Sequence, residues 1–324
     1  MFSALEETPN LPALGPAFLD CGAYSVMTGL WPELPLHDYY QYVAEYHQYY
    51  ATIAAPDVIG SMPDTFDNLV EFHSAMVEKG VWEDIRDRVA LTYHVTDKDY
   101  ATATKALKFA DQAGVGWLSI GGIVAPGMNT LQRYIAIGEI LNLVQRLGLK
   151  FKVHLFGGYE GEYIKAYKPD SVDSATYLQS AKVLTMTHYR AWDLVKQAVP
   201  KEHYLQNRML MNQARLLELG DRDERQDLFN VLDEIPDGVR LWLLNAWAVK
   251  KFEDWVRNQY GQKPDFKYWI TIDVTMVMAI TRYSEIVQRL FWRAWGDRCL
   301  VAYPTFWAGH GQRPKHTDKL VMFT

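Results

Sequence analysis

Short apolar runs alternate with amphipathic segments through the first half of the chain. The clearest runs lie at 51–55, 89–93, 116–120 and 151–156. Each run is bounded by turn-forming residues, a pattern typical of strands that are buried on both faces of a parallel sheet. The alternation therefore predicts a series of strand–helix units.

The segments between these runs have the apolar spacing of helices. The apolar stripes are Phe66, Leu69, Val70 and Val77 in one segment, and Leu131, Tyr134, Ile135, Leu141 and Leu147 in another. Asn129 and Gln132 have the spacing of a capping box at the start of the second helix. Gly80, Gly114 and Gly148 follow three successive helical segments, where glycine accepts a left-handed conformation at little cost.

Further strands are predicted at 2–5, 17–20, 171–173 and 299–303. Beyond residue 176 the apolar spacing predicts helix, with one face formed by Tyr177, Ala181, Leu184, His188, Trp192 and Val195. We therefore predict an α/β fold: a (β/α)₈ TIM-type barrel that forms a single catalytic domain over 1–324, with a mainly helical elaboration at 176–297. An open doubly wound sheet would give the same alternation.

Composition and charge limit the classes of protein to which this chain can belong. Hydrophobic residues make up 49 % of the 324 residues, enough for a sizeable core, and no apolar stretch is long enough to cross a bilayer. The start of the chain lacks the pattern of an export signal, so we expect a soluble, cytoplasmic protein. Cys21 and Cys299 are the only cysteines, which excludes a disulfide scaffold and a Cys-rich zinc site. For Cys21, a buried inert thiol is favoured over a nucleophile.

The net charge of −6 argues against a surface that is basic throughout. A local basic face is still available beyond residue 280. We take Arg282, Arg289 and Arg293 as candidate phosphate contacts, although a run of charges is more often only a solvated face.

Polar residues collect where the predicted strands end. They are Asp20, Asp57, His94, Gly121, Gly122, His154, Gly157, Gly158 and Asp173. In a parallel barrel these strand ends meet at one mouth, where active sites lie. Taken singly, each aspartate could cap a turn, each histidine could be a hydrogen-bonded core residue, and each diglycine could be a tight turn. Their convergence favours a site.

The residue types favour carboxylate chemistry over the alternatives. The predicted mouth has no close His spacing for a metal, the glycine-rich segment lacks the lysine of a P-loop, and no nucleophile elbow occurs. Asp20 and Asp173 suit attack at a sugar C1′, where one carboxylate forms a covalent glycosyl intermediate and the other shuttles a proton. Asp57 could accept hydrogen bonds from a guanine-like edge, the amides of Gly121 and Gly122 could approach a carbonyl, and Tyr24 could stack on the base.

These residues, in this order, resemble motifs of the tRNA-guanine transglycosylase superfamily. The matching segments are FLDCGAYS at 18–25, IAAPD at 53–57, GGIVA at 121–125, HLFGG at 154–158 and DSVDS at 170–174. The last segment is closer to the branch that inserts 7-deazaguanine bases into DNA in bacteria and phages than to the tRNA enzymes. The resemblance covers roughly residues 17 to 180.

The resemblance implies a glycosyltransferase (a pentosyltransferase) that exchanges guanine in DNA for a free 7-deazaguanine base such as preQ0. It implies Asp173 as the nucleophile, Asp20 as the acid/base group and Tyr24 as the stacking ring. It implies a base pocket that includes Asp57, His94, Gly121, Gly122, His154 and Gly157, with no metal and no cofactor.

The sequence also departs from the family pattern. The family's zinc-binding Cys/His cluster is absent, so we expect no zinc subdomain. Ser25 replaces the motif Gln, and Ile59 replaces a Cys two residues after Asp57. The missing zinc module favours DNA as the substrate over a folded tRNA.

Other functions remain open at this stage. The same base exchange could act on tRNA. A catalytically inactive barrel could bind nucleic acid, and a barrel glycosidase could cleave small nucleosides. The sequence leaves the oligomeric state open, and a homo-oligomer is among the arrangements that it allows.

Overall fold

The computed structural model describes ten segments of the chain. They are residues 17–29, 32–123, 128–158, 160–174, 185–190, 193–198, 237–259, 265–272, 288–291 and 299–301. The chain divides into two compact units. The first, which we call the barrel unit, comprises Pro16–Asp173 and Leu300–Tyr303; the second comprises Met1–Gly15, Ser174–Cys299 and Pro304–Thr324.

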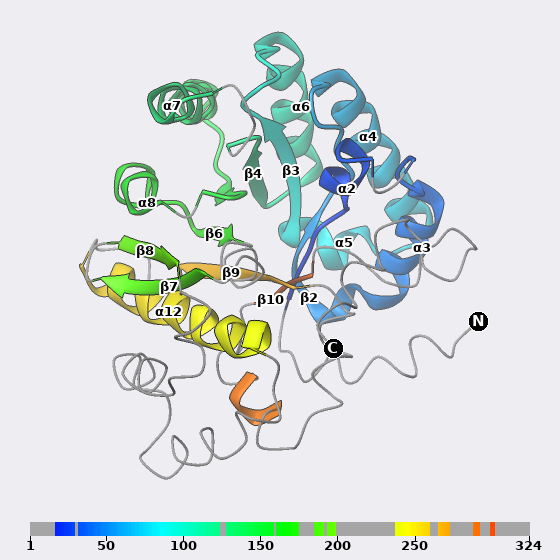
Figure 1. The fold of residues 1–324 in the computed structure, drawn as a ribbon. Coiled ribbons are helices and arrows are strands. Elements are labelled where there is room, and N and C mark those ends of the chain that lie inside the picture. The colour runs from blue at the N-terminus through cyan, green and yellow to red at the C-terminus, as the bar shows by residue number, and fades with distance from the viewer. Residues whose placement is uncertain are drawn as a thin grey trace. The chain divides into compact units, whose positions relative to one another are not determined.

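The barrel unit is built on a parallel sheet. Its strands are β1 (Ala17–Leu19), β2 (Tyr50–Ala54), β3 (Val89–His94), β4 (Trp117–Gly121), β5 (Lys152–Leu155), β6 (Ser171–Ser174) and β10 (Cys299–Val301). They lie in the order β10-β1-β2-β3-β4-β5-β6, and every neighbouring pair is parallel. This seven-stranded, nearly closed sheet (Figure 1) gives an α/β, barrel-like fold that is consistent with a TIM-type barrel.

The strands predicted from the apolar runs are confirmed within a residue or two, from β1 through β6 and at β10. They contain the fully buried residues that a sheet covered on both faces requires, such as Ile53, Leu118 and Leu155. The strand predicted at 2–5 lies outside the described residues.

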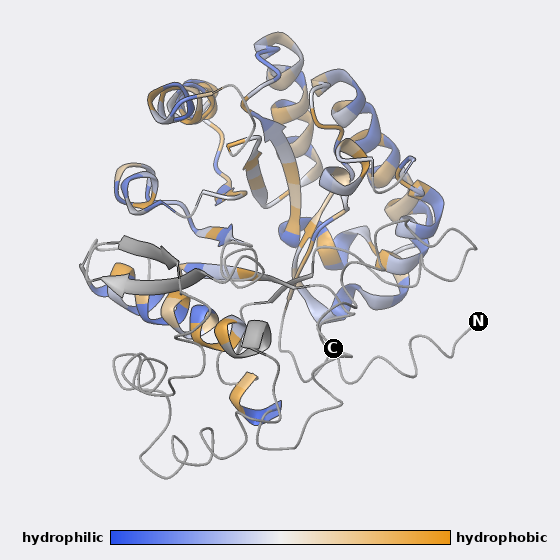
Figure 2. Ribbon diagram, in the orientation of Figure 1, coloured by the Kyte–Doolittle hydropathy of each residue, from blue (hydrophilic) through white to orange (hydrophobic). Residues whose placement is uncertain are grey.

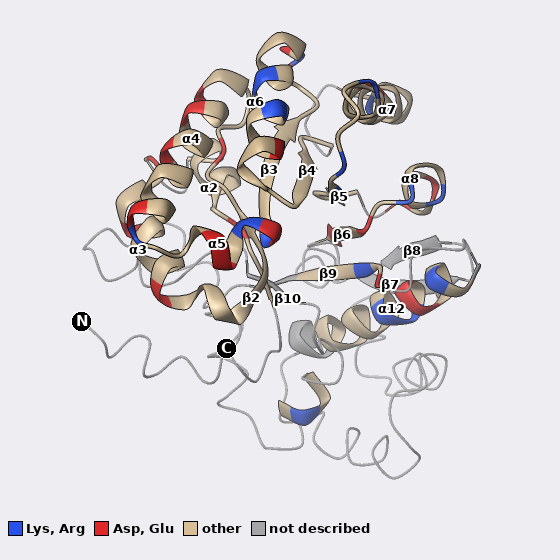
Figure 3. Ribbon diagram, turned by 180° about the vertical axis from the view of Figure 1, so that it is seen from behind, with Lys and Arg blue, Asp and Glu red and all other residues tan. Residues whose placement is uncertain are grey.

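Helices follow the strands of the barrel unit. They are α2 (Ala23–Met27), α3 (Leu36–Tyr46), α4 (Met62–Glu78), α5 (Trp82–Ile85), α6 (Tyr100–Ala113), α7 (Thr130–Arg146) and α8 (Gly161–Tyr167), with 3₁₀ turns at His47–Tyr49 and Arg86–Arg88. The helices carry both apolar and polar residues (Figure 2), and most Lys, Arg, Asp and Glu side chains lie on them rather than on the strands (Figure 3). No helix among the described residues has the length and apolar character needed to cross a membrane.

The predicted helix signals of this region are confirmed. Gly80, Gly114 and Gly148 all adopt positive φ angles, within two residues of the ends of α4, α6 and α7. Asn129 and Gln132 form the predicted capping box, in which each side chain accepts the other residue's backbone N–H. These contacts fix where each helix ends and where the next strand begins.

The predicted buried stripe of α7 is wrong. The residues that α7 buries are Ala136, Ile137, Ile140, Leu143 and Val144, whereas Leu131, Tyr134 and Ile135 are exposed. The two apolar rows lie on roughly opposite sides of this helix and both have helical spacing, so apolar spacing alone could not identify the row that faces the core. In α4, similarly, the predicted Val77 is exposed, and the buried stripe includes Met62, Leu69, Phe72 and Met76.

The second unit contains a two-stranded antiparallel sheet, a long helix and a further strand. These are β7 (Thr185–Arg190), β8 (Asp193–Ala198), α12 (Asp237–Gln259) and β9 (Lys267–Ile272). The α12 segment Leu241–Val249 is buried on all sides. Arg257 of α12 donates hydrogen bonds to the Phe266 carbonyl, and the neighbouring Glu253 carboxylate accepts the Tyr268 N–H.

The prediction of a helix through residues 185–198 is wrong, because β7 and β8 form a hairpin there. His188 and Val195, which were assigned to one helical face, are directly opposed across the two strands. A separation of seven residues suits two helical turns, but it also suits a cross-strand pair when the turn lies midway between the residues. The spacing therefore could not distinguish the two structures. The rest of the predicted elaboration at 176–297 lies largely outside the described residues.

Candidate active site

The register of the sheet decides which side chains point into the barrel unit. Thr92, Ser119, His154 and Ser171 are successive register partners across β3, β4, β5 and β6. The ring of His154 contacts the ring of Phe18 at 4.7 Å between centroids, although β1 and β5 are not neighbouring strands. This contact crosses the interior of the curved sheet, so the row that contains His154 faces inward.

Successive side chains along a strand alternate between its two faces. Two residues beyond the inward row, at the C-terminal ends of the strands, the same face therefore presents Asp20, His94, Gly121, Phe156 and Asp173. We call these five residues the mouth layer. Both aspartates that the sequence nominates for catalysis belong to it, as do His94 and Gly121.

The pKa of the Asp20 carboxyl group is strongly raised. Burial, the charge of Asp57 and the charge of Asp173 raise the pKa of Asp20 from 3.8 to about 7, against the opposing effect of backbone hydrogen bonds from Gly22 and Cys21. The Gly22 N–H lies 3.4 Å from Asp20 Oδ1. Asp173 is one of the charges that contribute to this shift, although Asp20 and Asp173 are far apart in the sequence.

Two groups from the β5 region, the Gly157 N–H and the His154 imidazole, lie against the Asp173 carboxylate. Its Oδ1 accepts the Gly157 N–H at 2.6 Å and lies 3.5 Å from His154 Nε2. On the far side of the imidazole, His154 Nδ1 lies 2.9 Å from Ser171 Oγ. Burial lowers the pKa of His154 despite the nearby Asp173, so the imidazole is neutral at physiological pH.

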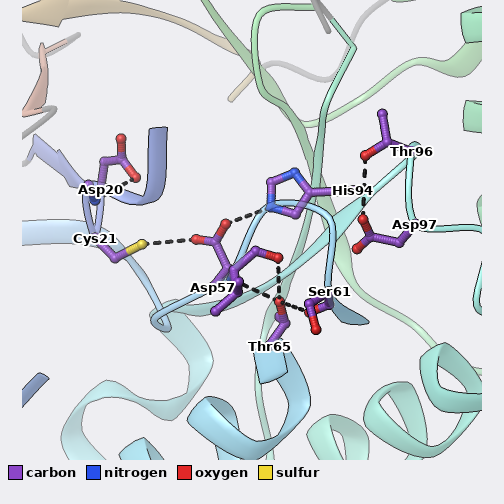
Figure 4. A network of polar contacts seen from close by, with 10 residues as sticks. Asp20, Cys21, Asp57, Ser61, Thr65, His94, Thr96 and Asp97 are labelled. Carbon is purple, nitrogen blue, oxygen red and sulfur yellow. Dashed lines mark hydrogen bonds and ion pairs between the residues drawn. The ribbon is translucent and has the colours of Figure 1, made fainter. Parts of the chain in front are cut away.

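Asp57 lies just after β2 and is buried, with only 3 % of its surface exposed. Its Oδ1 accepts the Cys21 thiol at 2.9 Å, and its Oδ2 lies 2.6 Å from His94 Nε2 (Figure 4). The role of Asp57 in reading a base edge stays a prediction. In this structure its two oxygens are engaged by side chains of the protein itself.

His94 is positioned by Asp57 and by the absence of a side chain at Gly121. Burial lowers the pKa of His94, but the hydrogen bond and charge of Asp57, with the charges of Asp97 and Asp20, outweigh burial and raise it. A Cβ at Gly121 would lie 2.6 Å from His94 Nδ1 and 2.7 Å from its Cε1. A glycine is therefore required here if the imidazole is to keep its place.

The structure adds two residues that the sequence did not nominate for the site. Asp97, after β3, accepts a hydrogen bond from Thr96, and burial raises its pKa against the lowering effect of His94 (Figure 4). Cys21 was expected to be a buried inert thiol, and it is buried with a pKa raised well above 9.0. What the sequence missed is the bond from its thiol to Asp57, which joins residues 36 apart in the chain.

Tyr24 lies on α2, the short helix that begins three residues after Asp20. The left-handed Gly22, with φ of 91°, turns the chain from β1 into this short helix. The Tyr24 side chain is 57 % exposed, so its ring is accessible to a ligand. Gly122 and Gly157 adopt positive φ angles of 74° and 70° beside the mouth layer.

The role of the nominated phosphate contacts stays a prediction. Arg289 belongs to the second unit and has an exposed side chain, while Arg282 and Arg293 lie outside the described residues. Among the residues that the structure describes, no three His, Cys, Asp or Glu side chains gather as a metal site would require.

Compared with known proteins, the sequence matches no family model and no curated protein.

Proposed function

We propose that this protein is a glycosyltransferase that exchanges guanine in DNA for a 7-deazaguanine base. The proposal is supported by the places of Asp20 and Asp173 at the C-terminal ends of β1 and β6, and by the charge of Asp173 contributing to the raised pKa of Asp20. A displacement at a sugar carbon with retention of configuration uses two carboxyl groups in different environments, one as the nucleophile and one as the acid/base group.

The first step of the proposed reaction removes the old base. The Asp173 carboxylate attacks C1′ while the bond from C1′ to guanine N9 breaks. The protonated Asp20 gives its proton to the departing guanine. The products are a neutral guanine and a glycosyl ester on Asp173.

The second step installs the new base. The ionised Asp20 takes the N9 proton of the incoming 7-deazaguanine, whose nitrogen then forms the bond to C1′. The ester bond breaks and restores the Asp173 carboxylate. A pKa of about 7 suits Asp20 to this double role, because both protonation states are populated near neutral pH.

The surroundings support a flat heterocycle as the ligand. Tyr24 is accessible for stacking, and Phe156 of the mouth layer packs against Phe18 and His154 in the layer below it. We further infer that the complete fold is an eight-stranded (β/α)₈ barrel without a zinc subdomain, and that it acts on DNA rather than on tRNA.

Incorporation of a labelled base tests the proposal. The protein is incubated with DNA and radiolabelled guanine or 7-deazaguanine, and label in the polymer is counted. We expect Asp20→Asn and Asp173→Asn to lower incorporation by at least about 1,000-fold, because each removes a group that reacts. Asp111→Asn, at an exposed position on α6, is the matched control and should behave as wild type.

Repeating the experiment with tRNA and with small nucleosides distinguishes the alternative functions. Label in tRNA but not in DNA would move the activity to tRNA. Release of free base from small nucleosides, with no label in any polymer, would indicate a glycosidase. DNA binding without incorporation, unaffected by the aspartate variants, would indicate an inactive binding barrel.

Substitution of the three candidate phosphate contacts tests whether the substrate is a polymer or a small molecule. Replacing Arg282, Arg289 and Arg293 together with alanine should weaken DNA binding and reduce its dependence on salt, since each phosphate contact releases counterions. If activity and its salt dependence are unchanged, these arginines do not contact the substrate.

A further inference from the structure

His154 occupies a different place from the other polar residues at the strand ends. It is fully buried, with 0 % of its surface exposed, and it lies one layer below the mouth. Its ring packs edge-on against Phe18 at 4.7 Å and against Phe156 at 4.5 Å between centroids. A ring clamped between two aromatic side chains in this way has little rotational freedom.

The polar atoms of the imidazole join two neighbours on β6. Nδ1 lies 2.9 Å from Ser171 Oγ, and Nε2 lies 3.5 Å from Asp173 Oδ1. A serine hydroxyl can donate to Nδ1, which leaves the proton of a neutral imidazole on Nε2, directed at Asp173. The three side chains then form one polar row, which we call the relay: Ser171 and His154 are hydrogen-bonded, and Nε2 faces the Asp173 carboxylate at an ion-pair distance without a hydrogen bond of its own in this structure.

We propose that His154, oriented by Ser171, is a positioning residue that fixes the Asp173 carboxylate for attack on the sugar. The inference rests on the proposed function and assigns His154 a structural task in it, in place of the direct substrate contact expected from the sequence. Together with the Gly157 N–H, His154 restrains Asp173 Oδ1 from two directions. A nucleophile held in this way has fewer orientations to lose on reaching the transition state.

A neutral imidazole suits this task better than a charged one. Burial lowers the pKa of His154, which keeps the ring uncharged near neutral pH. A neutral N–H that faces the carboxylate at 3.5 Å orients it through a weak dipolar attraction. An imidazolium would instead form an ion pair that stabilises the resting carboxylate and makes it a poorer nucleophile.

Two amide substitutions separate positioning from packing. In His154→Gln the side-chain nitrogen can take the place of Nε2 and still reach Asp173. In His154→Asn the amide matches Nδ1 and falls short of Asp173. His154→Phe keeps the aromatic packing and removes both polar atoms.

We expect His154→Gln to retain kcat within about 5-fold, and His154→Asn and His154→Phe to lose about 100-fold in kcat with little change in KM. His73→Gln is the matched control, since His73 packs against Trp82 and Phe109 away from the mouth layer and should leave kcat unchanged. Circular dichroism and thermal unfolding identify any variant that fails to fold. Wild-type kcat in folded His154→Phe would overturn the inference.

Nitrogen-15 NMR of the imidazoles gives a second test that needs no activity. The His154 signals are assigned by their loss in His154→Gln, and we expect a neutral ring with its proton on Nε2 near pH 7. A proton on Nδ1, or an imidazolium, would overturn the relay. If wild-type protein incorporates no base into any polymer, the proposed function fails, and the NMR result still decides the geometry of the relay.

Discussion

The raised pKa of Asp20 has a consequence for stability. Burial, Asp57 and Asp173 raise the pKa from 3.8 to about 7, so between these values the folded protein keeps a proton that the unfolded chain has released. The folded state then binds more protons, and the free energy of unfolding must fall as pH rises through this window. This destabilisation is at most about 4 kcal/mol; it is absent below about pH 4 and complete above about pH 8.

Asp20→Asn should remove this dependence, because the amide does not titrate. Relative to wild type, we expect the variant to gain stability steadily from about pH 4 to about pH 8. Urea denaturation at several pH values measures the difference, with Asp111→Asn as the exposed control. Parallel curves for wild type and Asp20→Asn would show that Asp20 titrates normally.

A second residue-scale prediction concerns Gly121. Because its Cβ would lie within 2.7 Å of two atoms of the His94 ring, Gly121→Ala must displace His94 from Asp57. We expect a loss of about 1–3 kcal/mol in the free energy of unfolding, as is usual for overpacking.

Gly138→Ala is the matched control for this substitution. Gly138 lies in α7, where the nearest atom to an added Cβ is the Tyr167 hydroxyl at 3.3 Å. A helical glycine gains about 1 kcal/mol from alanine, which offsets this contact. Equal stability of the two alanine variants would contradict the steric role assigned to Gly121.

The sequence located part of this site and missed the rest for a physical reason. Asp20, His94 and Asp173 could be nominated because a strand end in a parallel sheet has a predictable place. The bond from Cys21 to Asp57 and the relay from Ser171 through His154 depend on register and rotamer. Neither quantity leaves a signal in the spacing of residues along the chain.

At the scale of elements, α7 shows how one helix can carry two apolar rows. Ile135 is 50 % exposed and Ile137 is 0 % exposed, only two positions apart. Ile137→Ala should lower the free energy of unfolding by about 2–4 kcal/mol, because it leaves a cavity in the core. Ile135→Ala removes the same atoms from a solvated position and should change it by no more than about 0.5 kcal/mol. Chemical denaturation of both variants compares them directly, and similar losses would place Ile135 in the core as well.

The strands of the barrel unit were more predictable than its helix faces. A strand buried on both sides needs only a short continuous apolar run between turn residues, and β3 and β4 have such runs. The β7–β8 hairpin was missed because its cross-strand partners His188 and Val195 also have helical spacing. Local patterns specify an element well only when no other structure shares the same spacing.

At the scale of the whole chain, the central claim is that two carboxyl groups at one mouth perform a double displacement. The parallel order of strands β1 to β6 brings together residues as distant in sequence as Asp20 and Asp173. A glycosyl ester on Asp173 is the species that this claim requires and that neither an inactive binding barrel nor an inverting glycosidase would form.

Trapping that ester is the most direct test. The protein is mixed with DNA in the absence of an incoming base, quenched in acid, digested with protease and nuclease, and the peptides are mapped by mass spectrometry. We predict a deoxyribose-linked adduct on the peptide that contains Asp173, lost in Asp173→Asn and present in Asp111→Asn. Full base exchange by Asp173→Asn, or an adduct on another residue, would contradict the account.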